Sequence, residues 1–525
     1  MEPGEQAKDV NKNSYTNFFV LFSTSTSAGF LDGVKNFGGT VADTGKNVFN
    51  KTKSVVGVGD VVDTLEYPFI QSLEIDAQEH NITQQENYSY VDALKQDVLM
   101  SRRAGESIEP LENVNIYLNK IAAKLLISWK GYEVNTSIYV VSAEGYTAVA
   151  RSNGGIFIPI ETLNLIESED ELAALIAHEI SHVILKHHVV DNLDITLDKT
   201  MQYAQIGLAL KGGFNQDNIS KDLLNFQIAN FLITDAFFPK WNRGQENEAD
   251  LLGTDLLLNA GYSLNGMMSV LKKLAAYENE KEEIIFANYA KSEGEGMNAS
   301  FSLDIGGLVE QSANKLQDSL AKRHQDTDKR LNRLNNYVKK FYRDRQRPDI
   351  STERYIMMVK KDKQFIEHIE GFQASKTARN QMTKVGTNFT EIESNAIKGV
   401  SGNNSSDSFA RLAMFELRKA QGDIPTALKN LDIAMESGSA SYHIYYQKYI
   451  TYLQAGDFDA AINQLNLIDN EFGKEDIRLP NRIDVVRKSG NPVELMVAEC
   501  LTKGNMDLFQ MCQQAANGQY SPIGI

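Results

Sequence analysis

The pattern of apolar and polar residues predicts a helix centred on His178. Ser168, followed three residues later by Glu171, is typical of a capping box, and the acidic residues there suit the positive end of a helix dipole. The helix is expected to begin about ten residues before His178 and to continue to the basic residues 186–188. Its apolar residues at helical spacing are Leu172, Leu175, Ile176, Ile180, Val183, Ile184 and Leu185.

A second helical pattern begins at Gln245 and combines acidic with apolar positions. Glu246 and Asp250 are four residues apart and therefore share one face. Glu248 lies about 180° from the middle of that face at 3.6 residues per turn, so we expect it to meet solvent. The apolar positions that extend the helix are Leu251, Leu252, Leu256 and Leu257.

The segment Ala148–Ile158 predicts a strand, since its end is rich in β-branched and aromatic residues. Gly154 and Gly155 allow close approach of another backbone. Two interpretations remain open. An edge strand would bind an extended peptide through main-chain hydrogen bonds near Gly154, Gly155 and Ile156, whereas a strand of a core hairpin would not.

The C-terminal part contains an internal repeat with an offset of 34 residues, the period of tetratricopeptide (TPR) repeats. Two units are visible from 408 to 469, and chance periodicity in a helical region is the alternative. Since a solenoid needs three or more units, residues 351–400 and 484–517 are expected to supply divergent or capping helices. The matched pairs are Gly422 and Gly456, Asp423 and Asp457, Ala427 and Ala461, and Leu431 and Leu465.

These patterns predict a mainly α-helical protein with a small β-sheet, and 525 residues are enough for two or three domains. We expect four parts: a glycine-rich segment at 1–62 that could serve in targeting, a globular domain at 63–345, a helical connector at 346–400, and a TPR-like helical repeat domain at 401–525.

Charge and hydropathy narrow the classes of partner. A net charge of -16 and a pI near 5.1 give no basic surface for nucleic acid, and an acidic chain is expected to be soluble and repelled by anionic membranes. The best candidate for a membrane span, Leu223–Phe238, is too short and too polar to cross hydrocarbon. We expect it to be a buried or lid helix, and we expect no transmembrane span.

The sequence leaves the cellular compartment open. Lys8 and Lys12 precede an apolar run at 18–22, but nearby acidic residues are unlike the basic region of a signal peptide. Cys500 and Cys512 lie on either side of the turn at 503–505 in an expected helix–turn–helix, and they could pair across it. Two thiols in a cytosolic protein would be equally unremarkable.

The chemistry of the predicted helix lies in His178, Glu179 and His182. Residues four apart on a helix have Cβ atoms roughly 6 Å from each other, so both imidazoles can reach one metal ion. Glu179 lies one position further round, where its carboxylate can act as general base on a zinc-bound water. The alternative is an accidental spacing of two histidines on an ordinary buried helix.

A catalytic zinc ion uses three protein ligands and keeps a fourth position for water or substrate. We assign Glu246, in the stretch that opens the second helix, as the third ligand. Asp250 is then expected to accept the other N–H of a ligand imidazole, which fixes its tautomer. Without the histidine motif, this stretch would be an ordinary acidic helix start.

Together these motifs resemble the HtpX/BepA-like metallopeptidases, the family that includes the CAAX prenyl proteases and the mitochondrial Oma-type proteases. The likeness extends over roughly 91–342 and rests on the paired glycines 154–155, the acidic run 169–172, the H-E-x-x-H motif at 178–182 and the E-x-E-A-D motif at 246–250. It implies an α+β metallopeptidase domain of the gluzincin type with one zinc ion per chain.

The family's later H-P-x-x-x-x-R motif falls on His324 to Arg330, with Gln325 in place of the proline. By this resemblance, His324 and Arg330 would assist catalysis. His324 could stabilise an oxyanion or close the open zinc position and make the enzyme latent, and Arg330 could orient it or hold a nearby carboxylate. The strand also departs from the family, with Thr147 where asparagine is usual.

The resulting hypothesis is a zinc metalloendopeptidase that hydrolyses misfolded or stalled proteins, with a TPR-like domain that docks substrate or a partner protein. By resemblance to BepA-like proteins, it would act in protein quality control of the periplasm or cell envelope, with the cytoplasm as the alternative location. The other functional class is an assembly factor or holdase that acts through its repeats and has a latent or structural zinc site.

Overall fold

The computed structural model of the chain describes residues 61–79, 90–187, 243–277, 327–345, 348–382 and 389–520. The predictions made for the N-terminal glycine-rich residues before 61, for Leu223–Phe238 and for His324 lie outside these ranges.

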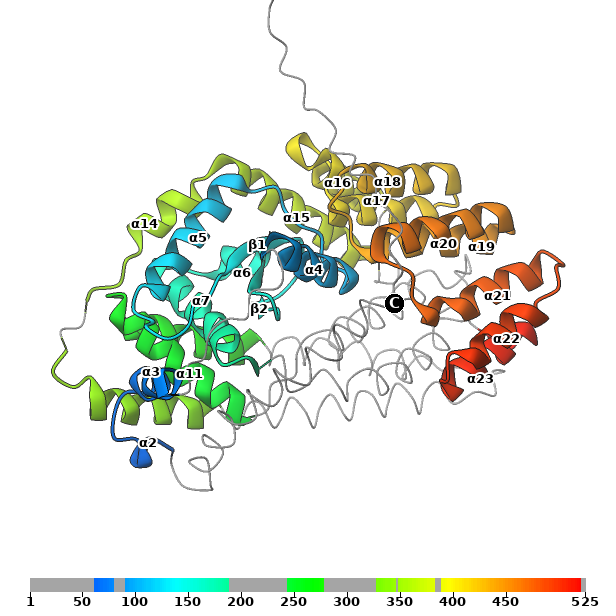
Figure 1. Cartoon of the computed structure of the whole chain (residues 1–525). Helices are drawn as coiled ribbons and strands as arrows, with labels where there is room; N and C mark the ends of the chain where they lie inside the picture. The colour runs from blue at the N-terminus through cyan, green and yellow to red at the C-terminus, as the bar shows by residue number, and fades with distance from the viewer. Residues whose placement is uncertain are drawn as a thin grey trace, which may run out of the picture.

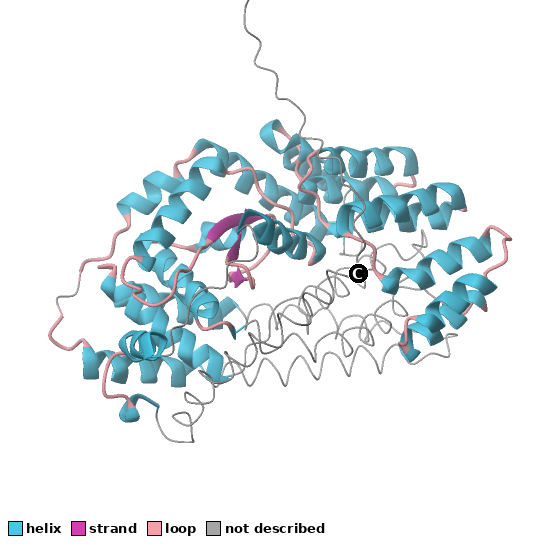
Figure 2. Cartoon of the chain, viewed as in Figure 1, coloured by secondary structure: helices cyan, strands magenta, loops and turns pink. Residues whose placement is uncertain are grey.

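The described residues are mostly helical and include one small sheet, as the sequence predicted (Figure 2). The elements up to the two metal-motif helices are α2 (Val61–Thr64), α3 (Phe69–Glu79), α4 (Tyr90–Arg103), α5 (Glu112–Leu126), β1 (Ser137–Val141), β2 (Val149–Ala150), β3 (Gly155–Pro159), α6 (Ile160–Leu165), α7 (Glu169–Ile184) and α11 (Arg243–Asn259). Residues 264–277 and 327–341 are also helical.

The remaining elements belong to the C-terminal part of the chain. They are α14 (Glu353–Tyr355), a π-helical turn (Ile356–Lys360), α15 (Lys363–Met382), α16 (Phe389–Gly399), a 3-10 turn (Gly402–Ser406), α17 (Ser408–Ala420), α18 (Ile424–Glu436), α19 (Tyr442–Ala455), α20 (Phe458–Phe472), a 3-10 turn (Asp476–Arg478), α21 (Leu479–Lys488), α22 (Glu494–Thr502) and α23 (Met506–Ala516).

The sheet has the strand order β1-β3-β2, with β1 parallel and β2 antiparallel to β3. The single strand predicted at 148–158 is therefore a hairpin of two strands. Its turn requires glycine at 154, where φ is 91° and a Cβ atom would overlap the carbonyl oxygen of Asn135. β3 is completely buried, because it lies between the other two strands and under helices.

One large hydrophobic core joins the sheet to α5, α7 and α11. It includes buried side chains from α3 and from residues 355–372, for example Phe69, Tyr355 and Phe372. The first part of the predicted connector at 346–400 therefore packs into the same core as the globular domain. In Figure 1, α14 and α15 lie alongside α5 and the sheet.

The C-terminal helices form successive antiparallel pairs, and Figure 1 shows α16 to α20 side by side, with α21 to α23 following beyond them. The repeated residues occupy equivalent places. Asp423 and Asp457 are the N-cap residues of α18 and α20, and each side chain accepts a hydrogen bond from the backbone three residues on. The glycines before them, Gly422 and Gly456, have φ values of 79° and 75°. Assignment of these pairs to the TPR class stays a prediction.

Cys500 and Cys512 form a disulfide that joins α22 to α23. The bridge lies in a separate small core formed by the last three helices, in which Cys500 and Cys512 are completely buried.

Ion pairs and a buried hydrogen bond connect α4 to the C-terminal helices. On α4, Arg102 donates to the carbonyl of Ala440 and pairs with Glu471, while Arg103 pairs with Glu475. Across the described ranges, no helix is both long and apolar enough to span a membrane.

Candidate metal centre

The helix that carries the two motif histidines is fixed at its start by the capping interaction expected from the sequence. The Ser168 hydroxyl accepts a hydrogen bond from the backbone N–H of Glu171 at 3.1 Å. The helix, α7, begins at Glu169 and is buried on nearly all sides. It ends at Ile184, earlier than expected, because Lys186 adopts a left-handed conformation with φ of 52°.

A glycine lets the second motif helix approach the first. A Cβ atom at Gly253 of α11 would lie 3.2 Å from both the Cα and the backbone nitrogen of His178. Glu246, Asp250 and Gly253 follow one another at i, i+4 and i+7, so one face of α11 presents all three to α7. The close crossing therefore brings a carboxylate from α11 to the histidines of α7.

His178, His182 and Glu246 converge on one point. The two Nε2 atoms are 3.1 Å apart, and each lies 3.6 Å from an oxygen of the Glu246 carboxylate. Ligand atoms about 2.1 Å from a tetrahedral zinc ion lie about 3.4 Å from one another. The three side chains therefore have the spacing that a zinc ion requires, and their donor set fits it.

The tautomers also favour a cation at this point. The Nδ1 of His178 lies 3.2 Å from a carboxylate oxygen of Asp250, which can only accept, so the proton of a neutral imidazole is on Nδ1 and the Nε2 lone pair faces the cluster. Burial lowers the pKa of His178, but the hydrogen bond to Asp250 and the negative charge of Glu246 outweigh it and raise the pKa overall. The carboxylates around His178 thus favour positive charge at this imidazole.

Arg330 neutralises the carboxylates on the α11 side of the cluster. It donates to Asp250 from Nε at 2.7 Å and from Nη2 at 2.8 Å, and its Nη2 lies 3.2 Å from Glu246. Although burial raises the pKa of Asp250, the Arg330 guanidinium and the contact with His178 hold that pKa well below its usual range. Arg330 therefore holds both carboxylates of the site.

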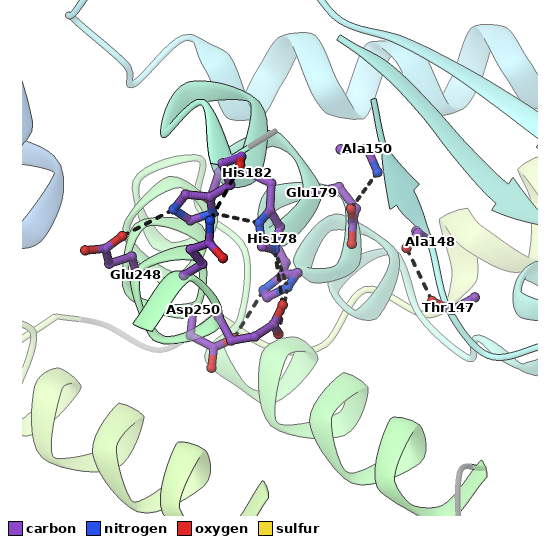
Figure 3. Close-up of polar contacts among 12 residues, drawn as sticks. Thr147, Ala148, Ala150, His178, Glu179, His182, Glu248 and Asp250 are labelled. Atoms are coloured by element: carbon purple, nitrogen blue, oxygen red, sulfur yellow. Dashed lines mark hydrogen bonds and ion pairs between the residues drawn. The ribbon is translucent and has the colours of Figure 1, made fainter. Parts of the chain in front are cut away.

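The Glu179 carboxylate lies between α7 and the sheet edge, as Figure 3 shows. Its carboxylate accepts a hydrogen bond from the backbone N–H of Ala150 at 2.8 Å. Burial raises the pKa of Glu179 to about 7, although the charge of His178 and the Ala150 hydrogen bond lower it. A carboxylate with such a pKa can both take up and release a proton at neutral pH.

Glu248 differs from the prediction that it meets solvent. It is buried, with 9% of its surface exposed, and its Oε2 lies 3.2 Å from Nε2 of His187. The reason is the turn after α7, which brings His187 over this side of α11. The sequence did not predict this contact, because a helix that continued through His187 would have directed the His187 side chain away from Glu248.

The glycines expected to contact substrate lie at the start of the central strand. Gly155 and Ile156 pair with β1 on one side, and Ile156 pairs with β2 on the other. The Gly155 N–H also donates to Asp97, at 2.8 Å, so the main chain here is occupied. The edge strand nearest α7 is instead β2. Asp97 of α4 is a buried carboxylate that accepts a hydrogen bond from Asn153 in the turn between β2 and β3, and no pattern in the sequence indicated this role.

Comparison with known proteins agrees with this geometry. Residues 112–338 match Peptidase family M48. Metalloprotease LoiP of Escherichia coli is 29% identical over 178 residues, which are 33% of this chain and 65% of that protein. Metalloprotease YcaL of the same organism is 24% identical over 175 residues, 33% of this chain and 64% of YcaL.

A third relative, the beta-barrel assembly-enhancing protease of Yersinia pestis, is 25% identical over 173 residues, 30% of this chain and 32% of that protein. The chain thus spans less than two thirds of the length of each of these three relatives. The family match begins at the first residue of α5, includes both motif helices and extends beyond Arg330. Residues 112–338, which are less than half of the chain, are therefore similar to Peptidase family M48, and the group of His178, His182 and Glu246 that could hold a zinc ion lies within them.

Proposed function

We propose that the protein is a zinc-dependent endopeptidase that hydrolyses peptide bonds of misfolded or stalled proteins. The observation that supports it most is the convergence of His178, His182 and Glu246 at ligand spacing, with the Glu179 carboxylate on the next helical position. A structural zinc site would have no need of a buried carboxylate at Glu179.

A zinc ion held by these three residues would supply the Lewis acidity that makes water a nucleophile at neutral pH. The chain supplies proton transfer. One oxygen of the Glu179 carboxylate accepts the proton of the attacking water and then delivers it to the departing amine. Asp250 and Arg330 keep His178 and Glu246 in place during these steps. The catalytic role suggested for His324 remains a prediction from the family resemblance.

An extended substrate would pair with β2, the edge strand next to α7. The strand packs against α7, and its Ala150 N–H already contacts Glu179, so a peptide along this edge would present its backbone beside the general base. Main-chain pairing recognises peptides with little regard to sequence, which suits a protease for unfolded chains.

The helical pairs from Ser408 to Phe472 would dock the substrate or a partner protein. Covalent attachment of such a surface would raise the effective substrate concentration at the metal site. The resemblance to a beta-barrel assembly-enhancing protease favours work in quality control of the cell envelope. The Cys500–Cys512 disulfide favours an oxidising compartment such as the periplasm.

Zinc stoichiometry and casein cleavage, measured on the same samples of full-length protein, test this function. We expect one zinc per chain in the wild type, loss of zinc in Glu246→Ala, and retained zinc without cleavage in Glu179→Gln. Glu167→Gln is the matched control, since this glutamate precedes the same helix and its side chain is 80% exposed.

Absence of zinc from the wild type would overturn the enzymatic proposal. Zinc without any wild-type cleavage of casein would favour the assembly factor or holdase. If cells that carry Glu179→Gln process the protein's substrates as wild-type cells do, that result would also favour the assembly factor or holdase.

A further inference from the structure

A buried chain of side chains leads away from His182 on the side opposite the metal cluster. Its Nδ1 lies 2.8 Å from Nδ1 of His187, and Nε2 of His187 lies 3.2 Å from Oε2 of Glu248. His182 and His187 are at most 1% exposed, and Glu248 is 9% exposed.

Ligation of a metal by His182 assigns the proton positions along this chain. Because Nε2 of His182 faces the cluster, the proton of its neutral imidazole is on Nδ1 and is donated to Nδ1 of His187. The proton of His187 is then on Nε2 and is donated to Glu248. In this arrangement each N–H of the two rings faces an acceptor. If the proton of His182 were on Nε2 instead, neutral His187 would carry its proton on Nδ1 and its Nε2 lone pair would face the Glu248 carboxylate.

The backbone conformation at Lys186 makes this contact. On a continuous helix, residues five apart point about 140° away from each other, so His187 could not meet His182. The left-handed φ of 52° at Lys186 turns the chain back after Ile184. Such a conformation costs a residue with a side chain roughly 1–2 kcal/mol. The Lys186 ammonium lies 4.8 Å from the ring centre of Tyr132, whose hydroxyl donates to the carbonyl of Ile184.

We propose that His187 and Glu248 are positioning residues of the metal site, which hold the His182 imidazole with Nε2 toward the ligand cluster. They do for His182 what Asp250 does for His178, but through an intervening imidazole. This inference rests on the proposed zinc site. It assigns to two residues outside the sequence motifs a share of the affinity for the metal, because outer partners of ligand histidines typically contribute 10–100-fold.

Zinc affinity of the full-length chain, measured by competition with a chromogenic chelator, tests the proposal. His187→Phe keeps the ring volume and removes both nitrogens, and we expect it to weaken zinc binding 10–100-fold. His187→Gln keeps an acceptor and a donor and should recover part of the loss. The control is His443→Phe on α19, far from the site in the chain, which should leave zinc affinity unchanged.

A double-mutant cycle distinguishes a chain from two separate contacts. Glu248→Gln alone should weaken zinc binding several-fold. Combined with His187→Phe it should add nothing further, since Glu248 acts only through the imidazole. At the turn, Lys186→Gly should retain zinc affinity because glycine accepts a positive φ, whereas Lys186→Val should lower it.

The outcomes separate this inference from the proposed function. Wild-type zinc affinity in His187→Phe, or additive effects of the two substitutions, would overturn the role of His187 and Glu248 and leave the protease proposal intact. Failure of the wild type to bind zinc would overturn both. If His187→Phe does not fold, Glu248→Gln and the Lys186 pair still decide the question through the same affinity measurement.

Discussion

Replacement of Arg330 by glutamine is expected to destabilise strongly the domain that contains α7 and α11. Arg330 makes two hydrogen bonds to Asp250, at 2.7 and 2.8 Å, and the two side chains are 13% and 2% exposed. A hydrogen bond to a charged group contributes roughly 1.5–3 kcal/mol. Removal of one partner from a buried ion pair costs roughly 3–5 kcal/mol, because the other charge stays buried without compensation.

The loss is measured as the free energy of unfolding in urea, in the presence of EDTA so that no metal contributes. Tryptophan fluorescence follows the relevant domain, since both tryptophans, at 129 and 241, precede the C-terminal helices in the chain. Lys95→Gln is the control. Lys95 and Asp92 form an exposed pair, with side chains 70% and 64% exposed, and such pairs contribute only about 0–1 kcal/mol.

Asp250→Asn completes the cycle. With the carboxylate already neutral, loss of Arg330 should cost much less, so the double variant should be clearly more stable than the sum of the two single effects predicts. A loss below about 1 kcal/mol in Arg330→Gln, or additive effects in the double variant, would refute the reasoning that this pair is a desolvated charge pair.

Three further predictions concern other parts of the structure. Burial raises the pKa of Asp255 to about 7 against three hydrogen bonds that lower it, so the folded state holds a proton that the unfolded chain releases near pH 4. The protonated Asp255 contributes its full stabilisation below pH 4, and this contribution is lost as the pH rises to 7. Between pH 5 and 7 the free energy of unfolding should fall by about 1.4 kcal/mol per pH unit. Urea unfolding of Asp255→Asn should lack this dependence on pH. Replacing Cys500 and Cys512 together by serine should destabilise the last helices by about 3 kcal/mol, and unchanged resistance to limited proteolysis would contradict it. Gly253→Val should separate α11 from α7, because a Cβ atom there would lie 3.2 Å from the backbone of His178, and competition with a chelator should show zinc affinity lowered roughly tenfold or more.

Local signals in the sequence were sufficient for the two motif helices. Ser168 and Glu171 mark the start of the first helix, and the spacing of His178 and His182 follows from 3.6 residues per turn alone. The repeat of Gly422 and Asp423 at Gly456 and Asp457 likewise corresponds to helix termini, because capping depends on a few neighbouring residues.

The sequence predicted strand pairing less completely than it predicted the helices. The segment 148–158 was predicted as one strand, and the structure folds it into β2 and β3. Composition cannot show where a strand reverses when the turn residues are also compatible with extension. This difference matters for the proposed function, because the strand at the edge of the sheet is β2 with Ala150, whereas Gly155 lies in the central strand β3.

The sequence by itself determined the candidate chemistry of this protein: the residue types, their helical spacing and the helix ends that place two candidate metal ligands beside a candidate general base. Only the tertiary structure decided which distant groups support that pair. Arg330 reaches Asp250 across 80 positions of the chain, and Glu248 reaches His187 across 61, because the glycine crossing of α7 and α11 and the left-handed turn at Lys186 bring them together. Such contacts follow from the packing of whole helices, which no local pattern of residues encodes.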